Sequence, residues 1–194
     1  MHLILQTVII LVLWAWLTGG LHYDGLADTA DAWVGGFGDR ERTLAIMKDP
    51  SCGPIGVLSI LIALLLKAAA IYVVLEQYYY AIALLILPCL ARTAPLILLG
   101  TCAYVRQQGI AQHMVQHLPK TALWLVVGIS GLSVLSFAWA GLLLLISFTV
   151  TLLYLRAKFV QRLGGTTGDS IGASIEILET MMILVLALFL SYSF

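Results

Sequence analysis

Charged residues are scarce in this 194-residue chain: only 10% of its residues are Asp, Glu, Lys or Arg. A typical soluble domain carries roughly 25% charged residues, because water has to solvate its surface. Ten acids and ten bases are too few to cover a 21.1 kDa globule, and they cancel to a formal net charge of +0. This scarcity excludes a soluble globular domain, a disordered chain and a protein that binds nucleic acid through a basic surface.

Cysteine is also scarce, and the motifs that would give it a chemical role are missing. The three cysteines form no Cys-x-x-Cys pair, so their spacing supports neither a metal site nor a disulfide framework. We interpret them as reduced packing residues. Neither of the two Gly-Gly stretches discussed below ends in the Lys-Ser/Thr of a P-loop, so ATP hydrolysis of that type is not indicated.

Apolar residues take the place of the missing charges: 61% of the chain is hydrophobic and the mean hydropathy is +1.02. A membrane-spanning helix needs about 20 residues, so a chain of this length accommodates about six. The apolar runs are continuous, which predicts an all-α polytopic membrane bundle that forms a single domain over residues 1–194. The first run is short, so we expect it either to continue into 18–20 or to follow an upstream segment. The six predicted spans are Leu3–Leu17, Pro54–Leu75, Tyr80–Leu99, Thr121–Phe137, Ala138–Leu155 and Gly172–Leu190.

The basic residues predict the orientation of these spans. Apart from Lys67 and Arg92, which fall inside spans, every base lies in one of three loops, and the other turns and both termini have none. Spans of alternating direction place these three loops on one side, which the positive-inside rule assigns to the cytoplasm. Both termini are then expected on the opposite side. The loop bases are Arg40, Arg42, Lys48, Arg106, Lys120, Arg156, Lys158 and Arg162.

Three of the ten acids lie close together in the stretch 19–31. If this stretch is helical, the offsets of four and seven residues put Asp24, Asp28 and Asp31 within an arc of about 60°. Three like charges on one face repel one another. A divalent cation would relieve this repulsion, and Mg²⁺ prefers such oxygen ligands. The alternative interpretation is a solvated helix face at the membrane surface.

A second Gly-Gly pair, Gly164 and Gly165, leads to a similar arrangement of acids. Aligning the two Gly-Gly pairs superimposes Asp24 on Asp169 and Asp31 on Glu176. We expect both turns to open helices at the cytoplasmic face, where backbone N–H groups bind phosphate oxygens and the acids bind metal.

The cations and a histidine complete the candidate site. Lys48, in the polar loop after the first acidic stretch, is either an interfacial charge or a phosphate ligand. Arg92 lies between Pro88 and Pro95, so we expect a kinked helix there, with Arg92 lining a polar cavity. Lys67 either joins such a site or extends to the interface. His22 is either a base or phosphate contact, or a structural interfacial residue.

Four stretches, taken in order, resemble the bacterial cobalamin synthase family, the adenosylcobinamide-GDP ribazoletransferases. Together they cover essentially the whole chain, and the first and last are specific motifs. Family members usually carry a further N-terminal segment before the first span, and we expect this segment to be absent here. The stretches are Gly-Gly-Leu-His-Tyr-Asp-Gly-Leu-Ala-Asp-Thr-Ala-Asp at 19–31, the loop 41–49 with Gly53 and Gly56, Arg-Thr-Ala-Pro at 92–95 followed by Arg106 and Gly109, and Leu-Gly-Gly-Thr-Thr-Gly-Asp-Ser-Ile-Gly-Ala at 163–173 followed by Glu176 and Glu179.

This resemblance implies a multi-pass enzyme of the bacterial inner membrane that acts late in vitamin B12 synthesis. Its substrates would be adenosylcobinamide-GDP and α-ribazole or its 5′-phosphate, its product besides the cobamide would be GMP, and its site would face the cytoplasm. The resemblance implies no nucleic-acid partner and leaves self-association open. The expected roles are metal binding through Mg²⁺ for Asp24, Asp28, Asp31 and Asp169, proton transfer for His22 or Glu176, and substrate binding for Lys48, Arg92, Arg106, Gly164, Gly165 and Glu179.

Two other functions compete with this one. A CDP-alcohol phosphotransferase of lipid synthesis also uses membrane-edge aspartates, but its pattern continues Asp-Gly-x-x-Ala-Arg, whereas Asp28 and Thr29 stand at the Ala and Arg positions here. A small ion-coupled transporter would keep its acids near the bilayer midplane. Asp24 and Asp169 lying far apart, or buried at mid-depth, would favour transport.

Overall fold

The described part of the chain is almost entirely helical. The computed structural model describes residues 2–106 and 119–193, and in these ranges β-type pairing is limited to an isolated bridge between Tyr104 and Thr166. Helices are expected here because lipid offers no hydrogen-bond partner to an unpaired backbone, and a helix satisfies its own. The predicted all-α fold class is confirmed. The helices and helical turns are α1 (Leu3–Leu17), α2 (Leu21–Gly35), α3 (Arg40–Ile46), α4 (Pro54–Glu76), η1 (Tyr78–Tyr80), α5 (Ala83–Ala91), α6 (Ala94–Thr101), α8 (Lys120–Val134), η2 (Leu135–Phe137), α9 (Trp139–Leu163) and α10 (Gly168–Ser193).

Among the described residues, five helical segments are long and apolar enough to cross a membrane. The pair α1 and α2 gives a sixth, but the two helices meet at an angle of 82°. The prediction of about six spans holds. The first span is broken between α1 and α2, whereas one of the two expectations was that the first helix continues through 18–20. The break lies at Gly19 and Gly20, whose φ angles of 60° and 72° are left-handed and end α1. The five segments are Pro54–Glu76, Tyr78–Thr101, Lys120–Phe137, Trp139–Leu163 and Gly168–Tyr192.

The span that contains Arg92 is interrupted as its prolines predict. Helix α5 ends at Ala91, Arg92 and Thr93 form a turn, and α6 begins at Ala94. Pro88 lies inside α5 and Pro95 in the first turn of α6, where the missing N–H of proline is tolerated. The expected kink is therefore confirmed.

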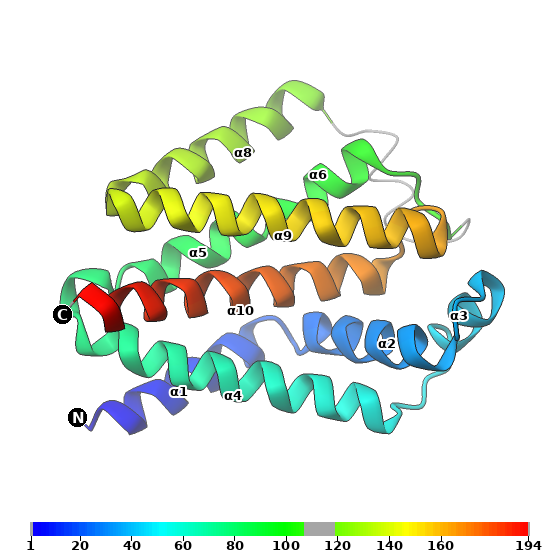
Figure 1. Ribbon diagram of the computed structural model, residues 1–194, viewed down its shortest axis with the longest axis horizontal. Helices are drawn as coiled ribbons and strands as arrows, with labels where there is room; N and C mark the ends of the chain where they lie inside the picture. The colour runs from blue at the N-terminus through cyan, green and yellow to red at the C-terminus, as the bar shows by residue number, and fades with distance from the viewer. Residues whose placement is uncertain (1, 107–118, 194) are drawn as a thin grey trace.

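Helix α10 is the centre of the bundle. It packs against α2, α4, α5, α6 and α9, and Figure 1 shows it between α4 and α9. Its Leu178, Met182, Ile183 and Leu186 are fully buried. The outer helices expose apolar side chains instead, as a lipid-facing surface does.

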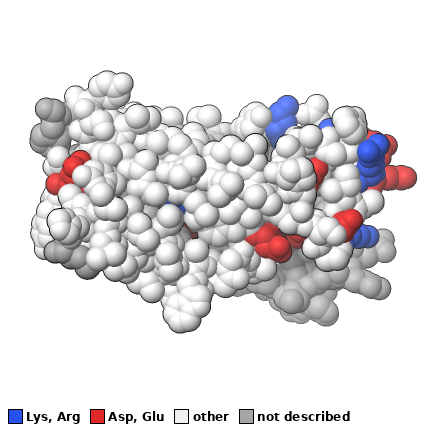
Figure 2. Space-filling model, turned by 90° about the horizontal axis from the view of Figure 1, so that it is seen from below, with Lys and Arg blue, Asp and Glu red and all other residues white. Residues whose placement is uncertain are grey.

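Charge is concentrated at one end of the long axis. Figure 1 shows both termini at one end and α3 at the other, and Figure 2 shows most of the visible Lys, Arg, Asp and Glu atoms at the α3 end. The side chain of Asp39 caps α3 by accepting a hydrogen bond from the Arg42 N–H at 2.7 Å. The termini therefore lie opposite the basic loops, as predicted.

Candidate active site

Close packing of α2 on α10 brings three aspartates together. A Cβ atom on Gly25 would lie 2.7 Å from the carbonyl oxygen of Asp169 and 3.2 Å from the Cα atom of Gly172, so a larger residue would force the helices apart. Asp24 adjoins Gly25, and Asp28 lies one turn further along α2. The carboxylate of Asp28 interacts electrostatically with those of Asp24 and Asp169. The two acidic motifs of the sequence therefore meet.

We call Asp24, Asp28, Asp169 and Arg106 the acidic site. Asp24 is exposed, while Asp28 and Asp169 are partly buried. The Nη2 atom of Arg106 donates to Asp169 Oδ2 at 2.6 Å and to the carbonyl oxygen of Met47 at 3.0 Å. Arg106 therefore binds Asp169 and interacts electrostatically with Asp28, and these four side chains carry three acids against one base.

The donor set of the acidic site suits a hard cation. Within residues 2–106 and 119–193, no group of three or more acids, histidines or cysteines is positioned to hold a metal ion by itself. Mg²⁺ usually takes only one or two protein carboxylates, and waters and substrate phosphates complete its coordination. The exposed Asp24 and the partly buried Asp28 and Asp169 fit that mode of binding.

Asp31, the fourth predicted metal ligand, is occupied differently. Its Oδ2 atom accepts a hydrogen bond from the Gly53 N–H at 2.7 Å, and its Oδ1 atom accepts one from the Gly56 N–H at 2.8 Å. Both donors belong to the N-terminus of α4, whose first N–H groups have no partner within the helix. The carboxylate of Asp31, a residue of α2, is therefore bound to the N-terminus of α4, while Asp24 and Asp28 face α10.

Gly164 and Gly165, predicted to bind phosphate, form a turn packed against the chain at 103–105. The N–H of Gly164 donates to Val160, and the N–H of Thr166 donates to Ala103. A Cβ atom on Gly165 would collide with the Ala103 carbonyl oxygen, which explains the glycine by lack of space. The turn has a structural reason for its glycines that the sequence alone did not suggest.

The first turn of α10 is held by reciprocal hydrogen bonds. The Thr167 N–H donates to Ser170 Oγ at 2.8 Å, and the Ser170 N–H donates to Thr167 Oγ1 at 3.1 Å. Residues 168–172 read Gly-Asp-Ser-Ile-Gly, the spacing of a serine nucleophile turn. Ser170 is fully buried, however, and its hydroxyl donates to the Thr167 carbonyl oxygen. It therefore acts as a cap.

A second group of charges, which we call the ionic cluster, consists of Lys67, Arg92, Glu176 and Glu179. Lys67 Nζ lies 2.6 Å from Glu176 Oε1 and 2.9 Å from Glu179 Oε2. Arg92 Nη1 lies 2.8 Å from Glu179 Oε1. The indole N–H of Trp14 donates to Glu179 Oε2 at 2.9 Å. Two acids from α10 are thus paired with two bases, one from α4 and one from the turn between α5 and α6.

Three members of the ionic cluster lie deep in the bundle, and the side chain of the fourth, Arg92, is 40% exposed. Lys67 is thirteen residues into α4, about 20 Å from its start at 1.5 Å per residue. Its side chain is 0% exposed, so the interpretation that it extends to the interface is wrong. Glu176, Glu179 and Arg92, predicted as a base and as substrate ligands, lie here with their charges paired to one another and to Lys67.

His22 and Lys48 occupy intermediate and peripheral positions. His22 is partly buried on α2 and interacts electrostatically with Glu179, Arg92 and Lys67. Its Nδ1 atom is buried without a hydrogen-bond partner. Lys48 is exposed, and it follows Met47, whose carbonyl oxygen binds Arg106. His22 therefore neighbours the ionic cluster, and Lys48 lies at the rim of the acidic site.

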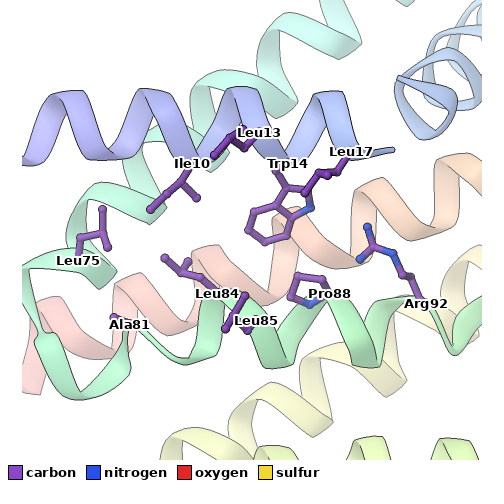
Figure 3. Close-up of a pocket in the computed structure, with 10 residues that line it drawn as sticks. All are labelled: Ile10, Leu13, Trp14, Leu17, Leu75, Ala81, Leu84, Leu85, Pro88 and Arg92. Atoms are coloured by element: carbon purple, nitrogen blue, oxygen red, sulfur yellow. The ribbon is translucent and has the colours of Figure 1, made fainter. Parts of the chain in front are cut away.

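An apolar cavity of about 440 Å³ lies between α1, α4 and α5. Figure 3 shows Trp14 and Leu17 on one side of it and Leu84 and Pro88 on the other. Among the described residues that line it, Arg92 is the only charged one. The expectation that Arg92 lines a polar cavity is therefore wrong: the guanidinium is bound to Glu179 and borders an apolar space.

Sequence reasoning missed how these charges are paired. The sequence allows two interpretations of Lys67, and it predicts neither the hydrogen bond from Trp14 to Glu179 nor the contact of Asp31 with α4. One signal was available for the cluster: two bases inside apolar spans and two acids well inside another must pair, because a lone charge in lipid is costly. The sequence does not say which base meets which acid.

Fold and site together define a polytopic α-helical membrane protein with a carboxylate-rich site at one end of its bundle. The sequence pattern of the cobalamin-5-phosphate synthase family matches residues 2–187, and the chain belongs to this family.

Relatives named adenosylcobinamide-GDP ribazoletransferase match nearly all of the chain. The protein of Acinetobacter baumannii (strain ACICU) is 57% identical over 180 residues, which cover 93% of this chain and 72% of that protein. The protein of Ectopseudomonas mendocina (strain ymp) is 50% identical over 185 residues, 95% of this chain and 76% of that protein. The protein of Pseudomonas fluorescens (strain Pf-5) is 48% identical over 188 residues, 96% of this chain and 77% of that protein. No solved structure matches this chain significantly.

Proposed function

We propose that this chain is a membrane-embedded enzyme that joins adenosylcobinamide-GDP to α-ribazole or its 5′-phosphate and releases GMP. The observation that carries this proposal is the meeting of Asp24, Asp28 and Asp169, from the two family motifs, beside Arg106. A diphosphate substrate needs a site that can hold both its negative charge and a metal ion. Family membership and the names of the relatives support the same reaction.

In the proposed reaction, an alcohol oxygen of ribazole forms a bond to the phosphorus that carries cobinamide. The bond from this phosphorus to the oxygen of GMP breaks, and the alcohol loses its proton. One or two of the carboxylates of Asp24, Asp28 and Asp169 would hold Mg²⁺, which would neutralise charge on the diphosphate. Arg106 and, at the rim, Lys48 would bind phosphate oxygens directly.

Proton transfer falls to a group that is free to accept a proton. Glu176 is 1% exposed and lies 2.6 Å from Lys67 in the ionic cluster, so we assign it to the scaffold rather than to proton transfer. His22, with an unpartnered Nδ1 atom, and Asp28, at the acidic site, remain as candidates. We assign Glu179 to the scaffold rather than to substrate binding, because it is 1% exposed and accepts hydrogen bonds from Trp14, Lys67 and Arg92. Arg92 is assigned to the scaffold as its ion-pair partner.

We further propose that the acidic site faces the cytoplasm across the bacterial inner membrane. The positive-inside rule supports this orientation, because the described basic loop residues lie at the acidic end. Cys52, exposed in the loop before α4, reports the orientation. A membrane-impermeant maleimide should label it in inverted vesicles and not in intact spheroplasts. The reverse pattern would contradict the proposal.

The catalytic proposal is tested with Asp24→Asn in membranes supplied with GDP-cobinamide and α-ribazole. Loss of GMP release, with an increased Mg²⁺ concentration for half-maximal activity, is the expected result. Full activity in stably folded protein would overturn the metal assignment. Asp39→Asn, which alters an exposed acid that caps α3, is the matched control.

The competing functions receive less support. A transporter was expected to show Asp24 and Asp169 apart or buried at mid-depth, whereas Asp24 is exposed and both interact with Asp28. The family match favours the cobamide reaction over lipid synthesis. Self-association stays a prediction, for which crosslinking in native membranes is the direct measurement.

A further inference from the structure

Asp31 belongs to the acidic motif by sequence, but its carboxylate is committed to another helix. Its two oxygen atoms accept hydrogen bonds from the Gly53 and Gly56 N–H groups, at 2.7 and 2.8 Å. These amides carry the positive end of the α4 dipole, so a carboxylate there is stabilised by charge as well as by hydrogen bonds. It caps α4 from a different helix.

The glycines of α4 are explained by this carboxylate. A Cβ atom on Gly53 would lie 2.6 Å from Asp31 Oδ1, and one on Gly56 would collide with Asp31 Oδ2 and lie 3.0 Å from the Cβ atom of Ala27. Both positions therefore have room for the Asp31 carboxylate only if they carry no side chain. The proposed reaction does not explain why Gly53 and Gly56 are glycines, but the space that the Asp31 carboxylate occupies does.

Helix α2, which carries Asp31, is also held on its other side by α10. Gly25 packs against Asp169 and Gly172 of α10, while Ala27 and Asp31 pack against α4. Rotation of α2 about its axis would break either the contact with α10 or the cap on α4. Asp24 and Asp28 also belong to α2, so the two contacts that fix this helix fix their positions as well.

We propose that Asp31 is a positioning residue, which caps α4 and thereby fixes the rotation of α2 that directs Asp24 and Asp28 to the acidic site. It is not a metal ligand in this proposal. The proposal rests on the proposed function only for its activity measurements, because the cap itself can be tested without substrate. Removing the cap should loosen the N-terminus of α4 and lower turnover while the metal affinity stays the same.

The test compares Asp31→Asn and Gly56→Ala with Asp24→Asn, all in a Cys89→Ser, Cys102→Ser background. Cys52, adjacent to Gly53, is exposed and then the only thiol. Asp31→Asn and Gly56→Ala should both speed its reaction with a water-soluble maleimide by about three- to tenfold, the range expected when a cap is lost. Asp24→Asn and the control Asp39→Asn should leave this rate unchanged.

The second measurement separates positioning from ligation. In Asp31→Asn and Gly56→Ala, kcat should fall, whereas the Mg²⁺ concentration that half-stabilises the protein against heat should change less than about twofold, below the cost of losing a charged ligand. In Asp24→Asn that concentration should rise. Gly56→Ala adds no ligand atom and removes none, so its agreement with Asp31→Asn supports positioning.

Two results would overturn the proposal. An unchanged Cys52 rate in both Asp31→Asn and Gly56→Ala would show that the cap does not hold α4. A Mg²⁺ dependence shifted in Asp31→Asn as far as in Asp24→Asn would make Asp31 a ligand. Failure of the proposed function looks different: Asp24→Asn would leave activity and Mg²⁺ dependence unchanged, while the Cys52 rates would still show whether Asp31 caps α4.

Discussion

The ionic cluster and the acidic site are built from the same kinds of side chain but differ in charge balance. In the cluster, Lys67 and Arg92 face Glu176 and Glu179, and Glu179 accepts an additional hydrogen bond from Trp14. The acidic site has three acids against one base, Arg106. Lys67, Glu176 and Glu179 of the cluster are buried and only Arg92 is exposed, whereas in the acidic site Asp24 opens to the surface.

This difference separates structural from chemical use of charge. A buried charge has to be paired, because leaving it alone in a medium of low dielectric constant costs several kcal/mol. Unbalanced carboxylates repel one another, and a protein tolerates them where a ligand or cation restores the balance. The ionic cluster therefore joins helices, and the acidic site is the place for an incoming ion and diphosphate.

The largest effect is expected from breaking the balanced region with Lys67→Met. The change leaves Glu176 without its ion-pair partner in the bundle, and removing one partner of a buried pair costs about 3–5 kcal/mol. We expect little folded protein in the membrane, or a strongly lowered Tm in detergent. Thermal unfolding of the purified chain measures this.

The matched control for Lys67→Met is Lys120→Met, at the exposed start of α8. It should leave Tm unchanged. Adding Glu176→Gln to Lys67→Met should recover part of the lost stability, because it removes the unpaired carboxylate. A Lys67→Met protein as stable as the wild type would show that the cluster is not held by its ion pairs.

The next largest effect is expected from Asp28→Asn, which changes the acidic site instead of the ionic cluster. Activity should fall by about a hundredfold or more, the usual result of removing an electrostatic group from a phosphoryl-transfer site. Stability should stay the same or rise, because Asn no longer repels Asp24 and Asp169. GMP release and Tm, measured on one preparation, give both values.

Asp49→Asn serves as the control, since Asp49 is an exposed acid in the loop beside the acidic site. It should keep both activity and Tm. If Asp28→Asn lowered Tm as far as Lys67→Met does, the acidic site would have a structural role like that of the cluster, and the contrast between the two regions would fail.

The sequence predicted the bundle and the composition of the site better than the partners within it. Apolar runs locate the helices because lipid demands them, and Pro88 and Pro95 locate the break at Arg92. Helical spacing also placed Asp24 and Asp28 on one face. Periodicity defines a face, however, and does not identify the helix opposite. Asp31 shares the predicted face but reaches α4, a contact that only the packing of α2 reveals.

A smaller effect, on substrate binding, is expected from changing Arg106, the base of the acidic site. Arg106→Gln removes the cation that binds Asp169 and the Met47 carbonyl oxygen. We expect KM for GDP-cobinamide to rise by about tenfold, the cost of one charge-assisted contact to phosphate. Arg156→Gln, which changes a partly buried arginine of α9 that donates to Thr101, is the control. An effect on kcat alone, with KM unchanged, would place Arg106 outside substrate binding.

The smallest effect should come from Trp14→Phe, which removes one hydrogen bond and leaves the charges of the cluster intact. Phe keeps an aromatic ring near Lys67, whose Nζ atom lies 5.1 Å from the Trp14 ring centroid, but it cannot donate to Glu179. Glu179 Oε2 still accepts from Lys67, so no buried acceptor is left unpaired. Losing such a bond costs about 1 kcal/mol, or about 2–4 °C in Tm for a chain of this size.

The control is Trp16→Phe, since Trp16 is 76% exposed on the same helix, and this change should leave Tm unaltered. Activity measured at a temperature well below both Tm values should be unchanged in Trp14→Phe, because the hydrogen bond stabilises the scaffold; a selective loss of kcat would instead couple the ionic cluster to the acidic site.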